Sequence, residues 1–467
     1  MFIYLIKAQW VRMVLLLLPQ LLISSALWSA TTHRISYPEA VRLALRNSPK
    51  IGISTADIDS AMAEITESRG AGLPKLNLEL NGAQSNNPLN VFGYKLSQGN
   101  ASFADFGAQQ YTGINAINTK PEALNHPGYY NNFNGGFKLT VPIYSGGKAS
   151  ARLEGAKALL RAAHQGDESA RMQLAYQVLE AYEGVLAANK IISIAKENVQ
   201  EAASYRDTTK ALLKLSVVIE SDLLLADNYL RAAKTSLLSA RIQAQNHLDE
   251  FQILIGRQQQ AFVPGNPVYF PATKKKIEQL LVDAVRNNSQ LRAIKSTIEA
   301  NRANINSAKS ASKPQVNLQL RQDWNGNSIG SGLPSNLIAL GVDWQLFSSG
   351  EQSGAINKAI AEVKKVSFQL DDALNSLRLS IIQAKRAEEL AKIEYVSNQA
   401  NTRQGRSIVN TLKKRYGRGL VPLGSVLESQ MRLTQAQSQS IQSQYNQKLA
   451  QGRLLLLTNQ LISHSDK

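Results

Sequence analysis

Residues 145–150, which read SGGKAS, come nearest in this chain to a motif that does chemistry. A phosphate-binding loop needs an earlier glycine, but Pro142 lies in that part of the chain, and Ala149 stands where a serine or threonine must follow the lysine. The absence of cysteine excludes disulfides, thiolate metal sites and cysteine nucleophiles. The histidines have no ligand spacing: His33, His126, His164, His247 and His464. The sequence therefore predicts a protein that is not an enzyme and needs no cofactor or metal.

Two pairs of similar strings indicate how the chain is organised. LPKLNLEL (73–80) and KPQVNLQL (313–320) share a proline, an asparagine and two leucines at a constant shift of 240 residues. VPIYSGGK (141–148) resembles WQLFSSGE (344–351) at a shift of 203, and one insertion in the first half reconciles the two shifts. Because the matches keep their order, we expect an internal duplication. The expected parts are a first repeat at 31–255, a linker at 256–275, a second repeat at 276–460 and a tail at 461–467.

Each repeat is expected to contain two strands, since apolar and polar residues alternate there with a period of two. The expected strands are 75–84, 136–144, 315–324 and 338–347. Ser145-Gly146-Gly147 follows the second strand of the first repeat, and Ser348-Ser349-Gly350 follows that of the second repeat. We expect both to turn a strand into a helix, because glycine adopts the necessary dihedral angles.

Long helices are expected after these turns, at 148–214 and 351–416, which contain no proline and consist mostly of good helix formers. At 1.5 Å per residue, each would span roughly 100 Å. Return helices are expected at 222–255 and 424–458. Shorter helices are expected before the strands, at 38–47, 50–72, 278–288 and 290–312.

The first thirty residues have the features of an export signal. Lys7 and Arg12 precede a short apolar run from Val14 to Trp28, which Pro19 interrupts. A spanning helix needs about 20 apolar residues, so a cleaved signal peptide at 1–30 is favoured over a membrane anchor. Small residues place the cleavage site near residue 26 or residue 30.

Four strands in one chain cannot form a closed barrel, because membrane barrels need at least about eight. An open sheet edge is not tolerated in lipid, so strands in a membrane would have to be completed by other chains. Three copies would supply twelve strands. The expected fold is therefore mostly α, with four strands per chain contributing to a twelve-stranded barrel in the membrane.

The ordered and duplicated set of strings resembles the TolC family of outer-membrane channel proteins. The strings are ALRNSPKI, the paired LPKLNL and KPQVNL, VPIYSGG with WQLFSSG, and RYGRGLVPLGSVLESQ. The resemblance implies a homotrimeric barrel in the lipid of the outer membrane, which continues as an α-helical tunnel of long hairpins through the periplasm. The implied role is an exit duct for tripartite efflux or type I secretion. The implied partners are a periplasmic adaptor (membrane fusion) protein and an inner-membrane transporter, and no nucleic acid is implied.

The resemblance also places a periplasmic gate at the tips of the helical hairpins. Asp222 and Tyr416 match the positions of a hydrogen-bonded link that closes the gate. Glu428 matches one of two acidic ring positions, whereas Ser425 occupies the other, and Val421 replaces an arginine of the gate. The residues that match the adaptor-docking tips are Ser216, Val217, Gly419 and Leu420.

Each of these residues also has a simpler interpretation. Asp222 could cap the N-terminus of a helix, and Glu428 could lie on a solvated helical face. The basic cluster at 413–419 could neutralise a helix C-terminus instead of meeting an acidic adaptor. The long segment 81–135 would be the larger extracellular loop; its aromatic residues could constrict the outer mouth or pack against the barrel.

Two other functions compete with the duct. A stand-alone diffusion porin would fill most of its length with alternating strands of about ten residues, and only four such segments occur here. A soluble coiled-coil scaffold that binds anionic partners is suggested by the net charge of +17. That scaffold would need neither the signal segment nor the alternating strands.

Overall fold

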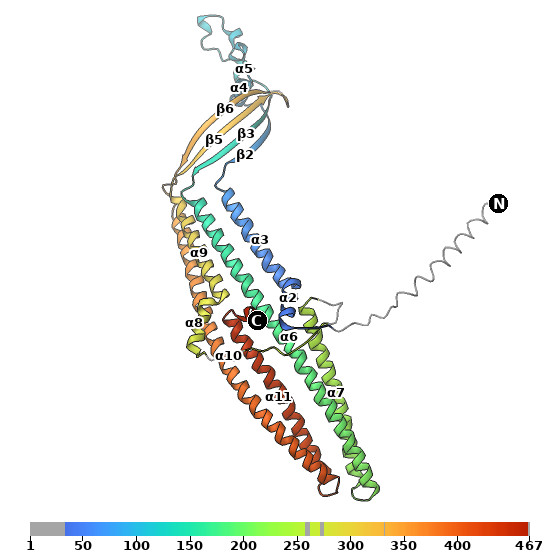
Figure 1. The fold of residues 1–467 in the computed structure, drawn as a ribbon. Helices are drawn as coiled ribbons and strands as arrows, with labels where there is room; N and C mark the ends of the chain where they lie inside the picture. The colour runs from blue at the N-terminus through green and yellow to red at the C-terminus, as the bar shows by residue number, and fades with distance from the viewer. Residues whose placement is uncertain (1–32, 257–261, 271–274, 331, 466–467) are drawn as a thin grey trace, which may run out of the picture. The chain divides into compact units, whose positions relative to one another are not determined.

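The computed structural model describes residues 33–256, 262–270, 275–330 and 332–465 (Figure 1). The expected signal peptide lies outside these residues, as does part of the expected linker. The chain forms two compact units: the sheet unit comprises 52–169 and 285–378, and the core unit comprises 33–51, 170–284 and 379–465. Each unit takes segments from both sequence repeats, because the long helices run from one unit into the other.

The sheet unit contains four antiparallel strands in the order β2-β3-β5-β6. Their bounds are Lys75–Ser85, Tyr130–Tyr144, Gln315–Gly326 and Leu333–Asp343. Leu76, Leu139, Leu320 and Ile338 pair in one row across all four strands. The next row carries Lys75, Thr140, Gln319 and Ala339. Because successive residues of a strand point to opposite faces, the sheet has an apolar face and a polar face.

The pairing registers of the two hairpins reproduce the sequence duplication. Leu76 pairs with Leu139 in the first hairpin, and Val316 pairs with Val342 in the second. These positions are related by the shifts of 240 and 203 residues that align the sequences. Each repeat therefore contributes one hairpin of the same geometry, and β3 and β5 join the two hairpins.

Two expected strands have wrong boundaries. β3 begins at Tyr130 instead of 136, because β2 extends to Ser85 and pairs with it. β6 runs from 333 to 343 instead of from 338 to 347. In the first repeat, the equivalent end of β3, from Val141 to Tyr144, pairs with β5 and not with β2. Residues 344–347 follow the last β5–β6 pair, Gln315 with Asp343, and no strand among the described residues pairs with them.

The turns from strand to helix have the same geometry in both repeats. Gly146 and Gly147 have φ values of 65° and 89°, and the equivalent Ser349 and Gly350 have φ values of 47° and 90°. A Cβ atom on Gly146 would lie 2.6 Å from the carbonyl oxygen of Ser310, so this turn requires glycine. The hydroxyls of Ser145 and Ser348 accept hydrogen bonds from the amides of Ala149 and Gln352 at 3.3 and 3.5 Å. They stabilise the first turns of helices α6 (Lys148–Lys214) and α10 (Glu351–Tyr416).

The remaining helices of the sheet unit flank these elements. They are α3 (Pro49–Gly70, in this unit from residue 52), α4 (Pro88–Ser97), α5 (Glu122–Asn125) and α9 (Ser289–Lys309). Short 3-10 turns are η1 (Phe103–Phe106), η2 (Ala108–Gln110), η3 (Ile114–Ala116) and η4 (Ser310–Ser312). Among the described helices of the whole chain, none is both long enough and apolar enough to cross a membrane.

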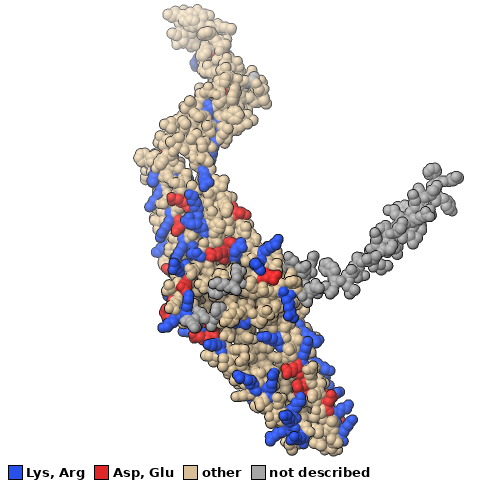
Figure 2. Space-filling model, in the orientation of Figure 1, with Lys and Arg blue, Asp and Glu red and all other residues tan. Residues whose placement is uncertain are grey.

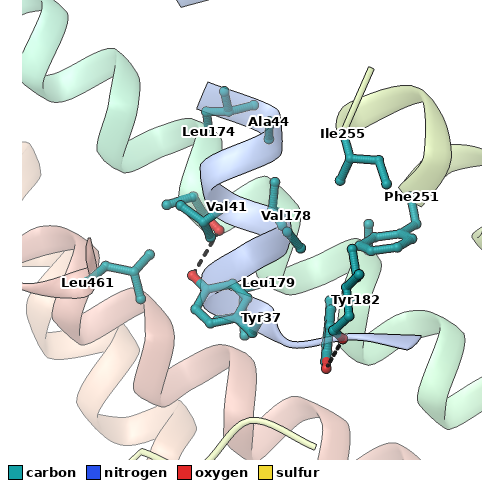
Figure 3. Packing of buried hydrophobic residues seen from close by; sticks show 14 of the residues in the cluster. Tyr37, Val41, Ala44, Leu174, Val178, Leu179, Tyr182, Phe251, Ile255 and Leu461 are labelled. Atoms are coloured by element: carbon teal, nitrogen blue, oxygen red, sulfur yellow. Dashed lines mark hydrogen bonds between the residues drawn. The ribbon is translucent and has the colours of Figure 1, made fainter. Parts of the chain in front are cut away.

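The core unit packs short elements around the middle of α6 (Figure 3). Its elements besides α6 and α10 are β1 (His33–Ile35), α2 (Tyr37–Asn47), α7 (Glu220–Leu254), β4 (Phe262–Pro264), α8 (Ile277–Asn287), α11 (Leu423–Leu457) and α12 (Leu461–Ser465). β1 and β4 pair in parallel. The hydroxyl of Tyr37 donates to the Ala175 carbonyl oxygen at 3.1 Å, and that of Tyr182 donates to Ile35 at 3.1 Å. Leu461 is fully buried, so the expected tail begins as part of the core.

Candidate functional site

The two hairpin tips of the core unit end in matching turns. The amide of Val217 donates to the carbonyl oxygen of Leu212, and the amide of Leu420 donates to that of Arg415, both at 3.0 Å. Ser216 and Gly419 lie just before Val217 and Leu420, with left-handed φ values of 56° and 72°. This is the hydrogen-bond pattern of a Schellman motif, which ends a helix on a residue of positive φ.

The tips also touch one another. A Cβ atom on Gly419 would lie only 2.9 Å from Cγ1 of Val217, so the close approach depends on glycine. The side chains of Val217 and Leu420 are half or more exposed. The structure therefore brings the four expected docking residues together, with two apolar side chains facing solvent at the end of the core unit.

A buried cluster lies directly behind the tips. It consists of Tyr205, Leu212, Ala226, Tyr416, Leu423, Val426 and Leu427, and we call it the tip cluster. These residues come from α6, α7, α10 and α11, so the cluster joins both hairpins. Val421 packs against it as a partly buried side chain. The position where the resemblance expects an arginine is therefore used for apolar packing.

Tyr416 is held by Thr209. Its hydroxyl lies 2.6 Å from Thr209 Oγ1, and the Thr209 hydroxyl donates to the carbonyl oxygen of Tyr205 at 2.7 Å. Because Thr209 has one proton to give, Tyr416 must donate to Thr209. Burial raises the pKa of Tyr416; the Thr209 hydrogen bond opposes this shift, and the charge of Asp222 adds to it. The tyrosine is therefore a neutral donor at physiological pH.

Asp222 lies close enough to Tyr416 for its charge to contribute to the raised pKa of the tyrosine. Within the described residues, its carboxylate makes no hydrogen bond to Tyr416, whose hydroxyl is on Thr209. Its interpretation as a helix cap is wrong, because α7 begins at Glu220 and the capping position is Ile219. Asp222 and Glu220 instead lie in the first turn of α7, where a carboxylate interacts favourably with the helix dipole.

A second polar layer lies farther along the same helices. Tyr205 donates from its hydroxyl to Gln430 Oε1 at 3.2 Å, and Tyr229 donates to Asn198 Oδ1 at 2.9 Å. Gln430 Nε2 also donates to Asn198 Oδ1, at 3.5 Å. Sequence reasoning missed Thr209, Asn198 and Gln430. Gln430 had a detectable signal, since it continues the apolar helical stripe of Leu423, Leu427 and Leu433 with a polar residue.

Charged side chains lie on the surface around the hairpin tips, at the lower end of the view in Figure 2. Lys413 pairs with Glu201, and its ammonium lies 5.6 Å from the centre of the Tyr205 ring. Lys413, Lys414 and Arg415 form the last turn of α10, where cations favour the helix C-terminus. Glu428 pairs with Arg432 at 2.8 Å on an exposed face of α11. Ser425 is half-buried in the first turn of that helix.

The model of the outer membrane efflux protein family matches residues 40–257 and 280–460. The chain belongs to this family. Membership makes it an exit duct of the outer membrane that extends into the periplasm, which confirms the expected function and location. No curated protein matches the chain.

Solved structures of outer membrane channels share the fold at low sequence identity. CusC aligns with 93% of this chain and 95% of its own, at 14% identity and a TM-score of 0.75. The CmeC channel of Campylobacter jejuni aligns with 91% of this chain and 86% of its own, at 15% identity and a TM-score of 0.73. VceC of Vibrio cholerae aligns with 91% of this chain and 96% of its own, at 15% identity and a TM-score of 0.74. The expected fold class, with strands at one end of long helices, is confirmed.

Proposed function

We propose that three copies of this chain form a passive duct, closed at the hairpin tips and opened there by a periplasmic adaptor protein and an inner-membrane transporter. Efflux and type I secretion both need such a duct, and the transporter determines the cargo. The observation that carries the trimer is the sheet itself. It has one apolar face and two open edges, β2 and β6.

The open edges are strongly apolar. Leu76, Leu78 and Leu80 on β2 are 60 to 74% exposed, and Ile338, Leu340 and Val342 on β6 are 64 to 76% exposed. Unpaired backbone groups of an edge strand cannot remain unsatisfied in lipid. β2 and β6 lie at opposite edges of an antiparallel sheet, so β6 of one chain can pair with β2 of the next and continue the pattern.

The duplication supplies the register of that pairing. Within the chain, β3 of the first repeat pairs with β5 of the second, and Leu139 lies opposite Leu320. On the open edges, Val342 of β6 is equivalent to Leu139, 203 residues earlier, and Leu80 of β2 is equivalent to Leu320, 240 residues later. We therefore expect Val342 to pair with Leu80 of the neighbouring copy, and residues 344–347 to gain the strand partner that they lack in a single chain.

Cysteine cross-linking tests both the trimer and the register. The chain has no cysteine, so in the double variant Val342→Cys with Leu80→Cys any disulfide must join the introduced thiols. Mild oxidation should give covalent dimers and trimers on a denaturing gel. Ala339→Cys with Leu80→Cys is the matched control and should remain monomeric, because these two residues lie on opposite faces. Equal cross-linking of both variants, or of neither, would contradict the proposed pairing.

The closed end is supported by the contacts that join the two hairpins. Tyr416 on α10 donates to Thr209 on α6, and Val217 touches Gly419 across the tips. Separating the hairpins must break the hydrogen bond and expose the tip cluster. Tyr416→Phe removes only the hydroxyl, so trimers in a planar bilayer should open more often. Unchanged ion conductance in both Tyr416→Phe and Thr209→Val would exclude this contact from the gate.

Glu428 has a weaker claim to a role in the pore. Three carboxylates that converge on an axis would attract cations, but here each carboxylate is paired with Arg432. Glu428→Ala leaves the guanidinium of Arg432 unpaired and should weaken the cation preference, whereas the double variant Glu428→Ala with Arg432→Ala restores the charge balance and should change the preference less. Reversal potentials in a salt gradient separate these outcomes.

A further inference from the structure

The segment that connects β2 to β3 is attached to one particular face of the sheet. It begins with α4, and Gln98, the residue after this helix, is only 7% exposed. Gln98 Nε2 donates to the carbonyl oxygen of Asn131 at 3.0 Å and to Oδ1 of Asn132 at 2.9 Å. A buried amide that makes two hydrogen bonds fixes the end of α4 against β3.

The face that α4 covers is the polar one. Asn132 shares its face of β3 with Asn134, Lys138 and Thr140, since these residues are spaced by two. Asn132 and Asn134 donate to Oδ1 of Asn325 on β5 at 3.4 and 3.0 Å. These amides form a polar layer under the end of α4.

The end of α4 also reaches across the sheet. The ammonium of Lys95 lies 5.5 Å from the centre of the Tyr130 ring on β3. A Cβ atom on Gly99 would lie 3.3 Å from Cδ2 of Leu333, the first residue of β6. The segment therefore spans from β3 to β6 at the end of the sheet that lies far from the helices.

The segment has its own internal packing. Lys95 pairs with Asp105 at 2.5 Å, and this contact is the largest cause of a pKa of about 2 for Asp105. The rings of Phe92 and Phe106 pack edge to face with their centres 5.1 Å apart. Val91 is buried. Such contacts favour one conformation over a mobile loop.

We propose that α4 narrows the outer mouth of the duct, so that the mouth as well as the hairpin tips restricts what passes. This inference rests on the proposed trimer, in which the polar face lines the lumen. Barrels of about eight strands are filled by side chains, and those of 16 to 18 strands hold an aqueous channel. Twelve strands lie between these limits. Three helices, each about 10 Å wide, would occupy much of such an opening.

Thiol labelling from outside intact cells tests the constriction. Thr140 lies on the polar face and pairs with Lys75, the first residue of β2, so a reagent from outside must pass α4 to reach it. Thr140→Cys would be the only cysteine in the chain. A small thiosulfonate should label it readily, and a maleimide on a polyethylene glycol chain should label it slowly.

Removing the segment should abolish this size discrimination. Ser85 pairs directly with Tyr130, so an Asn-Gly turn can replace residues 86–129 and close the hairpin. The large reagent should then react several-fold faster, with no change for the small one. An unchanged rate for the large reagent would overturn the constriction. If even the small reagent fails in both forms, the polar face lines no aqueous lumen, and the proposed duct fails with it.

Two glutamines give a milder and closely matched comparison. Gln98→Ala removes the contacts with the polar face, and labelling by the large reagent should rise by up to about tenfold, the factor that corresponds to about 1.4 kcal/mol. Gln84 also donates to a β3 residue, Asn131 Oδ1 at 2.9 Å, but lies on the opposite face. Gln84→Ala should leave the rate unchanged. An equal effect of both variants would indicate a general loosening of the sheet and would contradict the specific role of α4.

Discussion

A lysine placed on one face of β6 should disrupt the protein, and the same lysine one residue later should be tolerated. Ile338 belongs to the apolar row with Leu76, Leu139 and Leu320, and it is 76% exposed in the single chain. Ala339 points to the polar face beside Gln319. The substitutions Ile338→Lys and Ala339→Lys therefore add the same charge to the same strand on opposite faces.

The position of Ile338 in the strand determines the size of the effect. β6 has 11 residues, and Ile338 is close to its middle. At about 3.4 Å per residue the strand is roughly 37 Å long, and a tilt of about 45° reduces its height to roughly 26 Å. This height matches an apolar band of about 25 Å, so Ile338 would lie near the bilayer midplane. A lysine there costs about 2–4 kcal/mol per chain, or about 6–12 kcal/mol for three copies.

Urea titration of the protein refolded into lipid vesicles measures this cost, and a non-denaturing gel measures the fraction that is trimeric. Ile338→Lys should lose most of its trimer and lower the urea midpoint, whereas Ala339→Lys should stay close to the unsubstituted protein. If both lysines were tolerated equally, or if Ala339→Lys were the more harmful, the apolar face would not face lipid. The assignment of the polar face to the lumen would then be wrong as well.

Three further predictions concern two pairs of turn residues and the partly buried Tyr229. Ser216→Gly should raise the unfolding free energy by about 0.5–1 kcal/mol, because serine is strained at a φ of 56°. Gly419→Ala should lower the unfolding free energy, because it introduces the same strain at a φ of 72°. Thermal unfolding in detergent measures both changes. Gly146→Ala should destabilise by more than about 1 kcal/mol, since its Cβ would meet Ser310, whereas Ser349→Ala at the equivalent position should have little effect in the same assay. Burial raises the pKa of Tyr229 from 10.0 to about 12, so the stability that its neutral form contributes is complete below pH 10 and is lost as the pH rises through about 12. The urea concentration at the unfolding midpoint should fall as the pH rises between those values, and it should fall less in Tyr229→Phe. If the midpoint depends on pH equally in both proteins, this tyrosine is not the cause.

The sequence was informative wherever a local pattern determines a local structure. The absence of proline and the flanking serine and glycine residues defined the extent of α6 and α10, and the constant shifts identified equivalent strands. The end of β6 could not be predicted in this way. Apolar and polar residues continue to alternate as far as Leu346, but a strand also needs a neighbour, and Asp343 is the last residue of β6 that pairs with β5.

The candidate site was only partly predictable for a similar reason. Tyr416 and the tip residues could be located by resemblance, because they lie in recognisable strings. Thr209 could not, since neither it nor the adjacent Thr208 stands out from the other polar residues of a long helix. Its importance comes from the packing of two hairpins that are far apart in sequence. The attachment of α4 through Gln98 likewise depends on which face of β3 the preceding segment reaches.

The equal registers of the β2–β3 and β5–β6 hairpins have an evolutionary consequence. A half-length ancestor with a single hairpin would have needed six subunits to supply the strands that three chains supply now. Each fusion of two halves makes one intersubunit seam covalent and removes one association step, whose loss of translational and rotational freedom costs an estimated 4–15 kcal/mol. After such a fusion the two halves could diverge, and the long connection between β2 and β3 has no counterpart between β5 and β6.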